Sequence, residues 1–181
     1  MKPGIQFSYL PSPVGRLLIA GDSSGLHRIV FESERKPQSP APGWIEGGKP
    51  LAEAIEQLEA YFAGALQRFD LRLAAQGTPF QLRVWAALRE IPYGATISYG
   101  ELARRIGRPG AARAVGAANG QNPIPIVVPC HRVIGSNGNL VGFGGGLAVK
   151  RRLLALERTA ASSPQPSLWA GDRAWHGARS T

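Results

Sequence analysis

Cysteine is almost absent from this chain of 181 residues, since Cys130 is the only one. A lone thiol cannot form an intramolecular disulfide, cannot exchange electrons with a second thiol of the chain, and cannot build a cysteine-rich zinc site. An unpaired cysteine also suits a reducing compartment, which favours a cytoplasmic protein. Cys130 is therefore either a buried structural residue or a nucleophile.

Long apolar runs are missing as well. No segment approaches the ~20 apolar residues that a membrane helix needs. Residues 1–15 lack the basic-then-apolar pattern of a secretory signal. We therefore expect no membrane partner. A hydrophobic content of 44% is ordinary for a globular protein of one domain or two small ones.

Acidic residues are scarce in the second half of the chain. Residues 1–78 carry 8 basic and 8 acidic side chains, whereas residues 79–159 carry 11 basic and 3 acidic ones, a net charge of +8. Residues 160–181 add a net +1. This asymmetry favours a polyanionic partner, most simply nucleic acid. A basic protein without such a partner is the alternative that charge alone leaves open.

The first half predicts a small sheet and a helix. Three apolar segments separated by Pro, Gly, Ser and Asp turns predict an antiparallel meander at residues 5–10, 15–21 and 26–32. Residues 32–49 are polar and rich in Pro and Gly, which predicts a mobile loop. Apolar residues at helical spacing then predict a helix over 50–64, and alternation predicts a strand at 68–73.

The second half opens with two helix-capping patterns. Thr78 and Gln81 form a capping box that predicts a helix to about residue 90. Ser98 and Glu101 form another, which predicts a short helix closed by Gly107. A third helix is predicted at 111–119. Two helices joined by a tight Gly/Pro turn in a basic segment predict a helix-turn-helix, with an ordinary helical hairpin as the alternative.

The third predicted helix carries one long side chain, Arg113, among small ones. The small residues are Ala111, Ala112, Ala114, Gly116, Ala117 and Ala118. A helix that reads bases usually presents several polar side chains to their edges. One cation on a smooth surface instead indicates DNA contact that does not depend on sequence. Close packing on a neighbouring helix would also explain the alanines, but not Arg113.

The apolar run 124–129 predicts a buried strand that leads to Cys130. Asn137-Gly138 predicts a hairpin turn, and residues 147–157 predict a last helix that carries Lys150. The tail, with Trp169 and Trp175, is either disordered or docked on the surface.

A nucleophilic thiol must be ionised when it reacts, and His131 is the obvious base. Neighbouring residues of a strand point to opposite faces. The backbone must therefore bend at Cys130, or a water must bridge the two side chains. Glu157 is a candidate to orient the imidazole. A Cys–His–Glu set is also typical of thiol peptidases and acyltransferases, since such triads recur on unrelated folds.

Several ordered motifs carry a family resemblance. They are ISYGELAR at 97–104, AARAVGAANGQNP at 111–123, IPIVV at 124–128, PCHRVIG at 129–135 and GFGGGLAVKRRLLALE at 142–157. Together they resemble the active-site region of O6-alkylguanine-DNA alkyltransferases, also called methylated-DNA–protein-cysteine methyltransferases. The resemblance covers about residues 79–158 by motif and residues 1–78 by layout only.

The resemblance implies an α+β fold in three parts. Residues 1–78 would form a ribonuclease-H-like domain of a small sheet and a helix. Residues 79–159 would form a helical alkyltransferase domain with a winged-helix-like helix-turn-helix, which holds the active site. Residues 160–181 would be a C-terminal tail.

It also implies roles for the residues around the thiol. Cys130 would accept the alkyl group, His131 would deprotonate it through a water, and Glu157 would orient His131. Asn122 would brace the turn before the active site, and Tyr99 would donate a proton toward the leaving guanine.

The implied partner is double-stranded DNA with alkylated bases, bound through its minor groove. Arg113 would enter the base stack and fill the gap left by a flipped nucleotide. Small residues of the same helix (Ala112, Ala114 and Gly116), together with Tyr99, would lie against the DNA. Val133 and the Phe143–Gly144 loop would line the pocket for the base. Many members carry Tyr in place of Phe143 and some carry Ser in place of Gly144, so the range of alkyl sizes is left open.

The predicted activity is DNA repair by direct reversal. O6-Alkylguanine and O4-alkylthymine would be flipped from the duplex, and the alkyl group would pass irreversibly to Cys130, once per molecule. We expect a monomer, with cooperative assembly on DNA left open, and no cofactor or metal. A damage-sensing protein without transfer activity is one alternative, and a Cys–His thiol hydrolase is the other.

Overall fold

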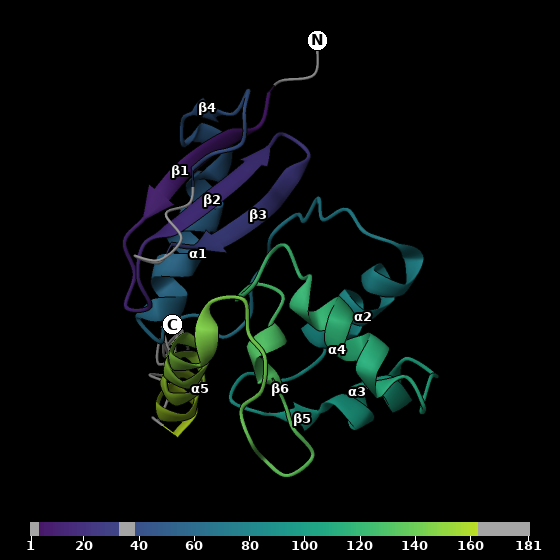
Figure 1. Cartoon of the computed structure of the whole chain (residues 1–181). Helices are drawn as coiled ribbons and strands as arrows, with labels where there is room; N and C mark the ends of the chain where they lie inside the picture. The colour runs from purple at the N-terminus through teal and green to yellow at the C-terminus, as the bar shows by residue number, and fades with distance from the viewer. Residues whose placement is uncertain (1–3, 33–38, 163–181) are drawn as a thin grey trace, which may run out of the picture.

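The N-terminal sheet follows the predicted meander. The computed structural model describes residues 4–32 and 39–162. In it β1 (Gln6–Leu10), β2 (Leu17–Asp22) and β3 (Gly25–Phe31) pair antiparallel in sequence order. A short β4 (Ile45–Glu46) adds to the free edge of β1 in parallel, which gives the order β3-β2-β1-β4 (Figure 1). The interpretation of 32–49 as a loop was therefore wrong at β4, whose two residues are too few to show a strand pattern.

One helix covers a face of this sheet. A 3-10 turn η1 (Lys49–Leu51) leads into α1 (Ala52–Phe62), which confirms the predicted helix and buries Leu58 and Tyr61 (Figure 1). The predicted strand at 68–73 was wrong, because the segment makes a single bridge between Leu73 and Leu26. The Gln57 side chain instead holds it by two hydrogen bonds to the backbone of Asp70, at 2.8 and 2.9 Å.

Three helices form the predicted helix-turn-helix region. They are α2 (Pro79–Arg89), α3 (Tyr99–Arg105) and α4 (Ala112–Gly120). The capping box of α2 is complete, with bonds between Thr78 and Gln81 in both directions. The second predicted capping box, at α3, was wrong in one half. The Ser98 hydroxyl accepts from the Glu101 amide as predicted, but the Glu101 carboxylate binds Arg104 and Arg105 instead of returning to the backbone of Ser98.

The segment before Cys130 is buried as predicted but is not a strand. Residues 124–128 fold into a turn in which the Val128 amide donates to the Ile124 carbonyl, and Ile126 has a φ of 76°. Prolines at 123, 125 and 129 lack the amide donors that a strand ladder requires. Cys130 therefore begins a 3-10 turn, η2 (Cys130–Arg132).

The chain beyond η2 departs from the predicted hairpin. β6 (Val133–Ile134) pairs in parallel with β5 (Ile97–Ser98), so the turn at Asn137-Gly138 does not join two strands. The last helix, α5 (Gly146–Ser162), continues five residues past the predicted end. Residues 163–181, with Trp169 and Trp175, lie outside the described part of the chain. Within residues 4–32 and 39–162 no helix is long and apolar enough to cross a membrane.

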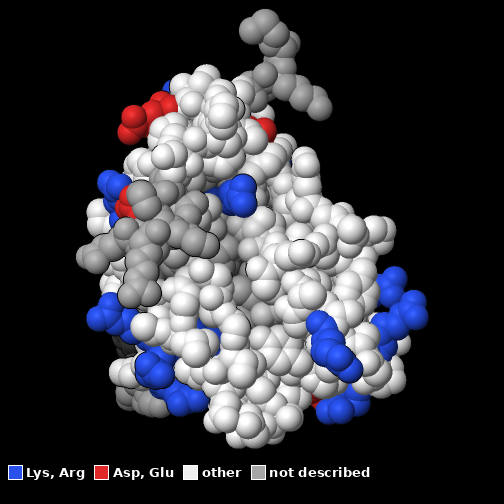
Figure 2. Space-filling view, viewed as in Figure 1, with Lys and Arg blue, Asp and Glu red and all other residues white. Residues whose placement is uncertain are grey.

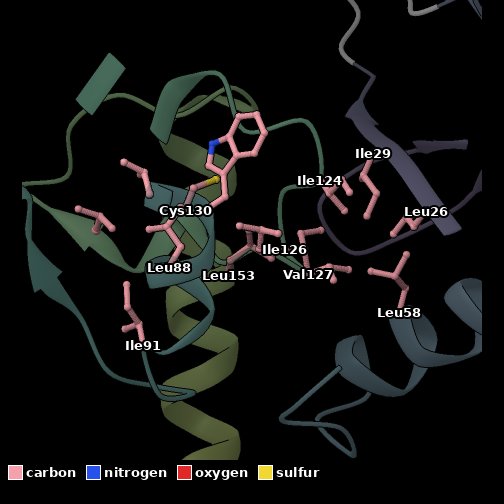
Figure 3. Packing of buried hydrophobic residues seen from close by; sticks show 14 of the residues in the cluster. Leu26, Ile29, Leu58, Leu88, Ile91, Ile124, Ile126, Val127, Cys130 and Leu153 are labelled. Carbon is pink, nitrogen blue, oxygen red and sulfur yellow. The ribbon is translucent and has the colours of Figure 1, made fainter. Parts of the chain in front are cut away.

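The two halves share one hydrophobic core. Figure 3 shows Ile124, Ile126 and Val127 between the sheet-and-helix half and the helices around Cys130. On one side of them lie Leu26, Ile29 and Leu58, and on the other Leu88, Cys130 and Leu153. The Ile29 amide also donates to the Pro123 carbonyl across this boundary, at 2.9 Å. The thiol therefore lies where both halves meet.

Candidate active site

Cys130 lies at the wall of a cavity between the two halves. The cavity, of about 630 Å³, is lined by β3, by the end of α4 and the following loop, and by residues 143–146. Cys130 belongs to this lining although the residue is only 4% exposed. The thiol is thus sheltered from bulk water yet open to a molecule that enters the cavity.

Burial keeps this thiol protonated at rest. It raises the pKa of Cys130 to about 11, and neither the hydrogen bond from Asn122 nor the nearby Lys150 cation offsets the effect. At neutral pH the thiolate is therefore a small fraction of the protein. A reaction at Cys130 needs a base that removes the proton in place.

The base next to Cys130 is held by a carboxylate. His131 and Glu157 are both fully buried, and Nε2 of His131 lies 2.7 Å from Oε1 of Glu157. The other ring nitrogen, Nδ1, is buried and has no hydrogen-bond partner among the described residues. The 3-10 turn provides the bend at Cys130 that a base in the next residue requires.

The carboxylate of Glu157 accepts five hydrogen bonds. Oε1 accepts from the Tyr61 hydroxyl at 2.8 Å, from His131, and from Nη2 of Arg132 at 2.9 Å. Oε2 accepts from Nε of Arg132 at 2.9 Å and from the Gly94 amide at 3.0 Å. Burial alone would raise the pKa of Glu157, but the bonds from His131 and Arg132 outweigh it and lower the pKa to about 2. Glu157 is therefore a fixed anion, and a fixed anion can only accept from His131.

Three residues around Cys130 and Glu157 were not among the predicted site residues. They are Tyr61 in α1, Arg132 in η2 and Lys150 in α5. The ammonium of Lys150, in a residue that is fully buried, donates to the carbonyls of Val133 at 2.6 Å and Val141 at 2.8 Å. Its burial lowers the pKa of Lys150, while the nearby thiol opposes that shift.

Asn122 lies in the turn between α4 and η2, at the predicted place. Its Nδ2 donates to the Val128 carbonyl at 2.8 Å, and its Oδ1 accepts from the Ile124 amide at 3.0 Å. Both bonds close the loop that contains the φ of 76° at Ile126. The amide therefore stabilises an unusual backbone directly before the thiol.

Tyr99 lies at the start of α3, against α4. A Cβ added to Gly116 would lie 3.7 Å from the Tyr99 ring, an ordinary van der Waals contact, so the ring packs directly beside this position of α4. The Tyr99 hydroxyl points to the Val141 carbonyl at a long 3.5 Å. Burial raises the pKa of Tyr99 and the nearby Cys130 adds to the effect, so the phenol carries its proton at neutral pH.

The predicted pocket residues divide into two groups. Phe143 and Gly144 line the cavity with Cys130, and the Phe143 ring packs on Phe31 of β3 at a centroid distance of 5.4 Å. Val133 and Tyr99 are not among the residues that line it. The Val133 carbonyl accepts from Lys150.

Arg113 is exposed on α4, away from the cavity lining. Ala114 is exposed beside it, and Ala112 and Gly116 are partly exposed. Figure 2 shows basic side chains over the region of α3 and α4 and over α5, with few acidic ones beside them. This helix therefore presents a smooth surface with a single cation on a basic part of the molecule.

The fold and the site define a class of protein: a small sheet-and-helix part joined to a basic helix-turn-helix part, with a buried nucleophilic thiol between them. Residues 5–75 match the ribonuclease-like domain of 6-O-methylguanine DNA methyltransferase, and residues 79–159 match its DNA binding domain. The chain therefore belongs to the 6-O-methylguanine DNA methyltransferase family.

Curated relatives align with this chain along most of their own length. The methylated-DNA–protein-cysteine methyltransferase of Methanosarcina acetivorans is 52% identical over 151 residues, which is 83% of this chain and 97% of the relative. The enzyme of the same name from Mycolicibacterium paratuberculosis is 54% identical over 154 residues, 85% of this chain and 93% of the relative. A crystal structure of Mycobacterium tuberculosis OGT in complex with DNA superposes with a TM-score of 0.80 at 50% identity, covering 86% of this chain and 94% of the other. The predicted family and α+β fold are thus confirmed.

Proposed function

We propose that this protein repairs DNA by direct reversal, transferring the alkyl group of O6-alkylguanine, and of O4-alkylthymine, to its own Cys130. The observation that carries the proposal is a thiol at a cavity wall whose neighbour, His131, is a base held by a buried carboxylate. The names of the relatives support the same activity. We assign it to the cytoplasm, where an unpaired thiol stays reduced.

The transfer begins with the proton of the thiol. Since Glu157 is ionised, Nε2–H of His131 donates to its Oε1, and the lone pair of the neutral imidazole is on Nδ1. Burial lowers the pKa of His131 despite its bond to Glu157, which keeps the ring neutral and able to accept a proton. Nδ1 takes the proton of Cys130 through a bridging water, and the imidazolium forms beside a charge that stabilises it.

The alkyl transfer is a displacement at carbon. The sulfur of Cys130 forms a bond to the alkyl carbon while the bond from that carbon to O6 of guanine breaks. Tyr99, a protonated phenol near the thiol, donates a proton to the guanine as it leaves and recovers one from the medium. The product is a thioether, and a thioether offers no route back to the thiol here. One molecule therefore repairs one base.

The base must leave the duplex to reach a buried thiol. Arg113 enters the stack in place of the flipped nucleotide, while Ala112, Ala114 and Gly116 bring the backbone of α4 close to the minor groove. The base then lies at the thiol against Phe143 and Gly144, with the Cys130 carbonyl as an acceptor for its polar edge, while the Val133 carbonyl, which accepts from Lys150, backs the site. Asn122 holds the turn that presents the thiol.

This function divides the chain into three parts, which we place at residues 1–78, 79–159 and 160–181. The second part binds DNA and carries the thiol. The first part closes the cavity with β3 and supplies Tyr61 to the carboxylate network.

Mass spectrometry of the peptide that contains Cys130 tests the proposal. Incubation with an excess of duplex that contains O6-methylguanine is expected to add one methyl group per molecule and to restore guanine in the DNA. The Cys130→Ser variant should bind the duplex and gain no methyl group. Repeated turnover would indicate a thiol hydrolase or another catalyst, and binding with no change in mass would indicate a damage-sensing protein; either result would refute the proposal.

A further inference from the structure

Tyr61 belongs to the half of the chain that carries neither the thiol nor the helix-turn-helix. It lies near the end of α1, 96 positions before Glu157, yet its hydroxyl donates to Oε1 of Glu157 at 2.8 Å. Both side chains are fully buried. A hydrogen bond to a charged group in such surroundings is short and strong because no water competes for either partner.

The contact falls on the same oxygen that accepts from His131. Oε1 therefore divides its acceptor capacity between Tyr61, His131 and Arg132. Each donor that polarises this oxygen lowers its remaining basicity, and so limits how strongly Glu157 stabilises a positive charge on His131. Tyr61 thus acts on the base through the carboxylate.

The ring of Tyr61 is fixed independently of its hydroxyl. It packs against Phe62, Phe69 and Tyr93, with centroid distances of 5.4, 5.3 and 6.0 Å. Burial raises the pKa of Tyr61 well above its usual value, and the negative charge of Glu157 adds to the effect. The phenol is consequently a permanent donor, aimed at Glu157 by an aromatic cluster.

From this geometry we infer that Tyr61 is a positioning residue of the alkyl-transfer site, through which the N-terminal half sets the orientation and the basicity of His131. The expected effect of Tyr61 on the rate of alkyl transfer rests on the proposed function. Its expected effect on the pKa of His131 rests on the hydrogen bonds alone. The N-terminal half carries no thiol, yet α1 supplies one of the five hydrogen bonds to Glu157. The site is therefore incomplete without this half.

The chain offers a matched pair of variants for the test. Tyr61→Phe removes the hydroxyl that donates to Glu157 and keeps the ring in its cluster. Tyr93→Phe makes the same chemical change one ring away, at a hydroxyl that is buried without a hydrogen-bond partner among the described residues. Four donors to Glu157 remain in Tyr61→Phe, so no buried acceptor is left empty and the variant should fold.

Two measurements are made on both variants and on the unmodified protein. The first is the single-turnover rate constant for methyl transfer from O6-methylguanine duplex between pH 5 and 9. The second is the pKa of His131 in the protein without DNA, followed by NMR of the imidazole carbons. We expect Tyr61→Phe to raise the pKa of His131 and to move the acidic limb of the rate profile to higher pH, because Glu157 then stabilises the imidazolium more strongly. We also expect the plateau to fall roughly tenfold, about 1.4 kcal/mol, because Glu157 loses one of the bonds that orient it and, through it, the imidazole. Tyr93→Phe should match the unmodified protein in both.

The outcomes separate this inference from the proposed function. If the unmodified protein transfers no methyl group, the proposed function fails, and the NMR titration alone still decides the role of Tyr61. If transfer occurs but Tyr61→Phe keeps the plateau and the pKa of His131, the inference is overturned. A lower melting temperature in Tyr61→Phe with unchanged titration and rate profile would also overturn it, because that result describes a structural residue only.

Discussion

Glu157 is a fully buried carboxylate whose charge is balanced by the guanidinium of Arg132, and Arg132 also donates to the Ile91 carbonyl at 2.6 Å. Removing one partner of a buried ion pair leaves the other charge uncompensated, which costs far more than a surface pair is worth. The same residue therefore serves stability and the proposed chemistry.

The first prediction concerns Glu157→Gln. The variant keeps the size of the side chain but leaves Arg132 without an anion, and we expect a loss of about 3–5 kcal/mol in the free energy of unfolding at pH 7. Urea denaturation measures it, and the surface variant Glu56→Gln is the control. A loss below 1 kcal/mol would mean that the network contributes little to the fold.

The pH dependence of that loss has a definite sign. The pKa of Glu157 is about 2 in the folded protein against a usual value of 4.5. A lowered folded-state pKa contributes stability that is present above the unfolded value and is lost as the pH falls through the folded one. The gap between the unmodified protein and Glu157→Gln should therefore narrow as the pH is lowered from 5 toward 2, and a constant gap would contradict the assignment.

Sequence reasoning found the central part of this site and missed the residues that support it. Cys130, His131 and Glu157 are brought together as the motifs indicate. Tyr61 was missed because a Tyr three positions after Leu58 on an apolar helix face is usually a packing residue. The hydroxyl of Tyr61 could have indicated its role, since a Tyr on a buried helix face usually needs a hydrogen-bond partner. Lys150 was missed because it begins a basic run that resembles a solvated surface.

Among the structural elements, α4 was predicted most completely and the segment before η2 least. This helix has no side-chain cap, but the Gly and Pro residues of the turns beside it act locally and bound it. Residues 124–128, in contrast, are apolar at every position and so show no period that separates a strand from a turn. The conformation there depends on tertiary contacts, including the bonds from Asn122 and the φ of 76° at Ile126. β4 was missed because its pairing partner, β1, lies far away in the sequence.

The exposed face of α4 carries a second prediction, for Arg113→Ala. If Arg113 fills the gap left by a flipped base, its loss should slow methyl transfer from duplex DNA by about 10–100-fold, since flipping costs a few kcal/mol. Transfer from the free base O6-methylguanine should be unchanged, because Arg113 does not line the cavity. Rates on both substrates are compared with Arg72→Ala, which removes one exposed charge from the other half. Equal slowing on both substrates would place Arg113 in the chemistry or the fold instead.

At the scale of the whole molecule, the core shared by the two halves predicts that they unfold as one unit. Leu58 of α1 is fully buried against the segment that leads to Cys130 (Figure 3). Truncating Leu58 should therefore destabilise the region around Cys130 as much as it destabilises the sheet. The single cysteine makes this measurable, because any alkylating reagent for thiols labels one position.

The last prediction is that Leu58→Ala destabilises the entire chain. The cost should be about 2–5 kcal/mol, as for other large-to-small changes in a core. Labelling of Cys130 by iodoacetamide under native conditions should become faster by the factor that this loss implies, with one denaturation midpoint for circular dichroism and for labelling. Leu82→Ala, at a residue that is 43% exposed in α2, is the control and should change neither. If the α1 region unfolds while Cys130 stays protected from iodoacetamide, the two halves fold separately and the prediction is wrong. In that case the hydrogen bond from Tyr61 to Glu157 would depend on the contact between two independent domains.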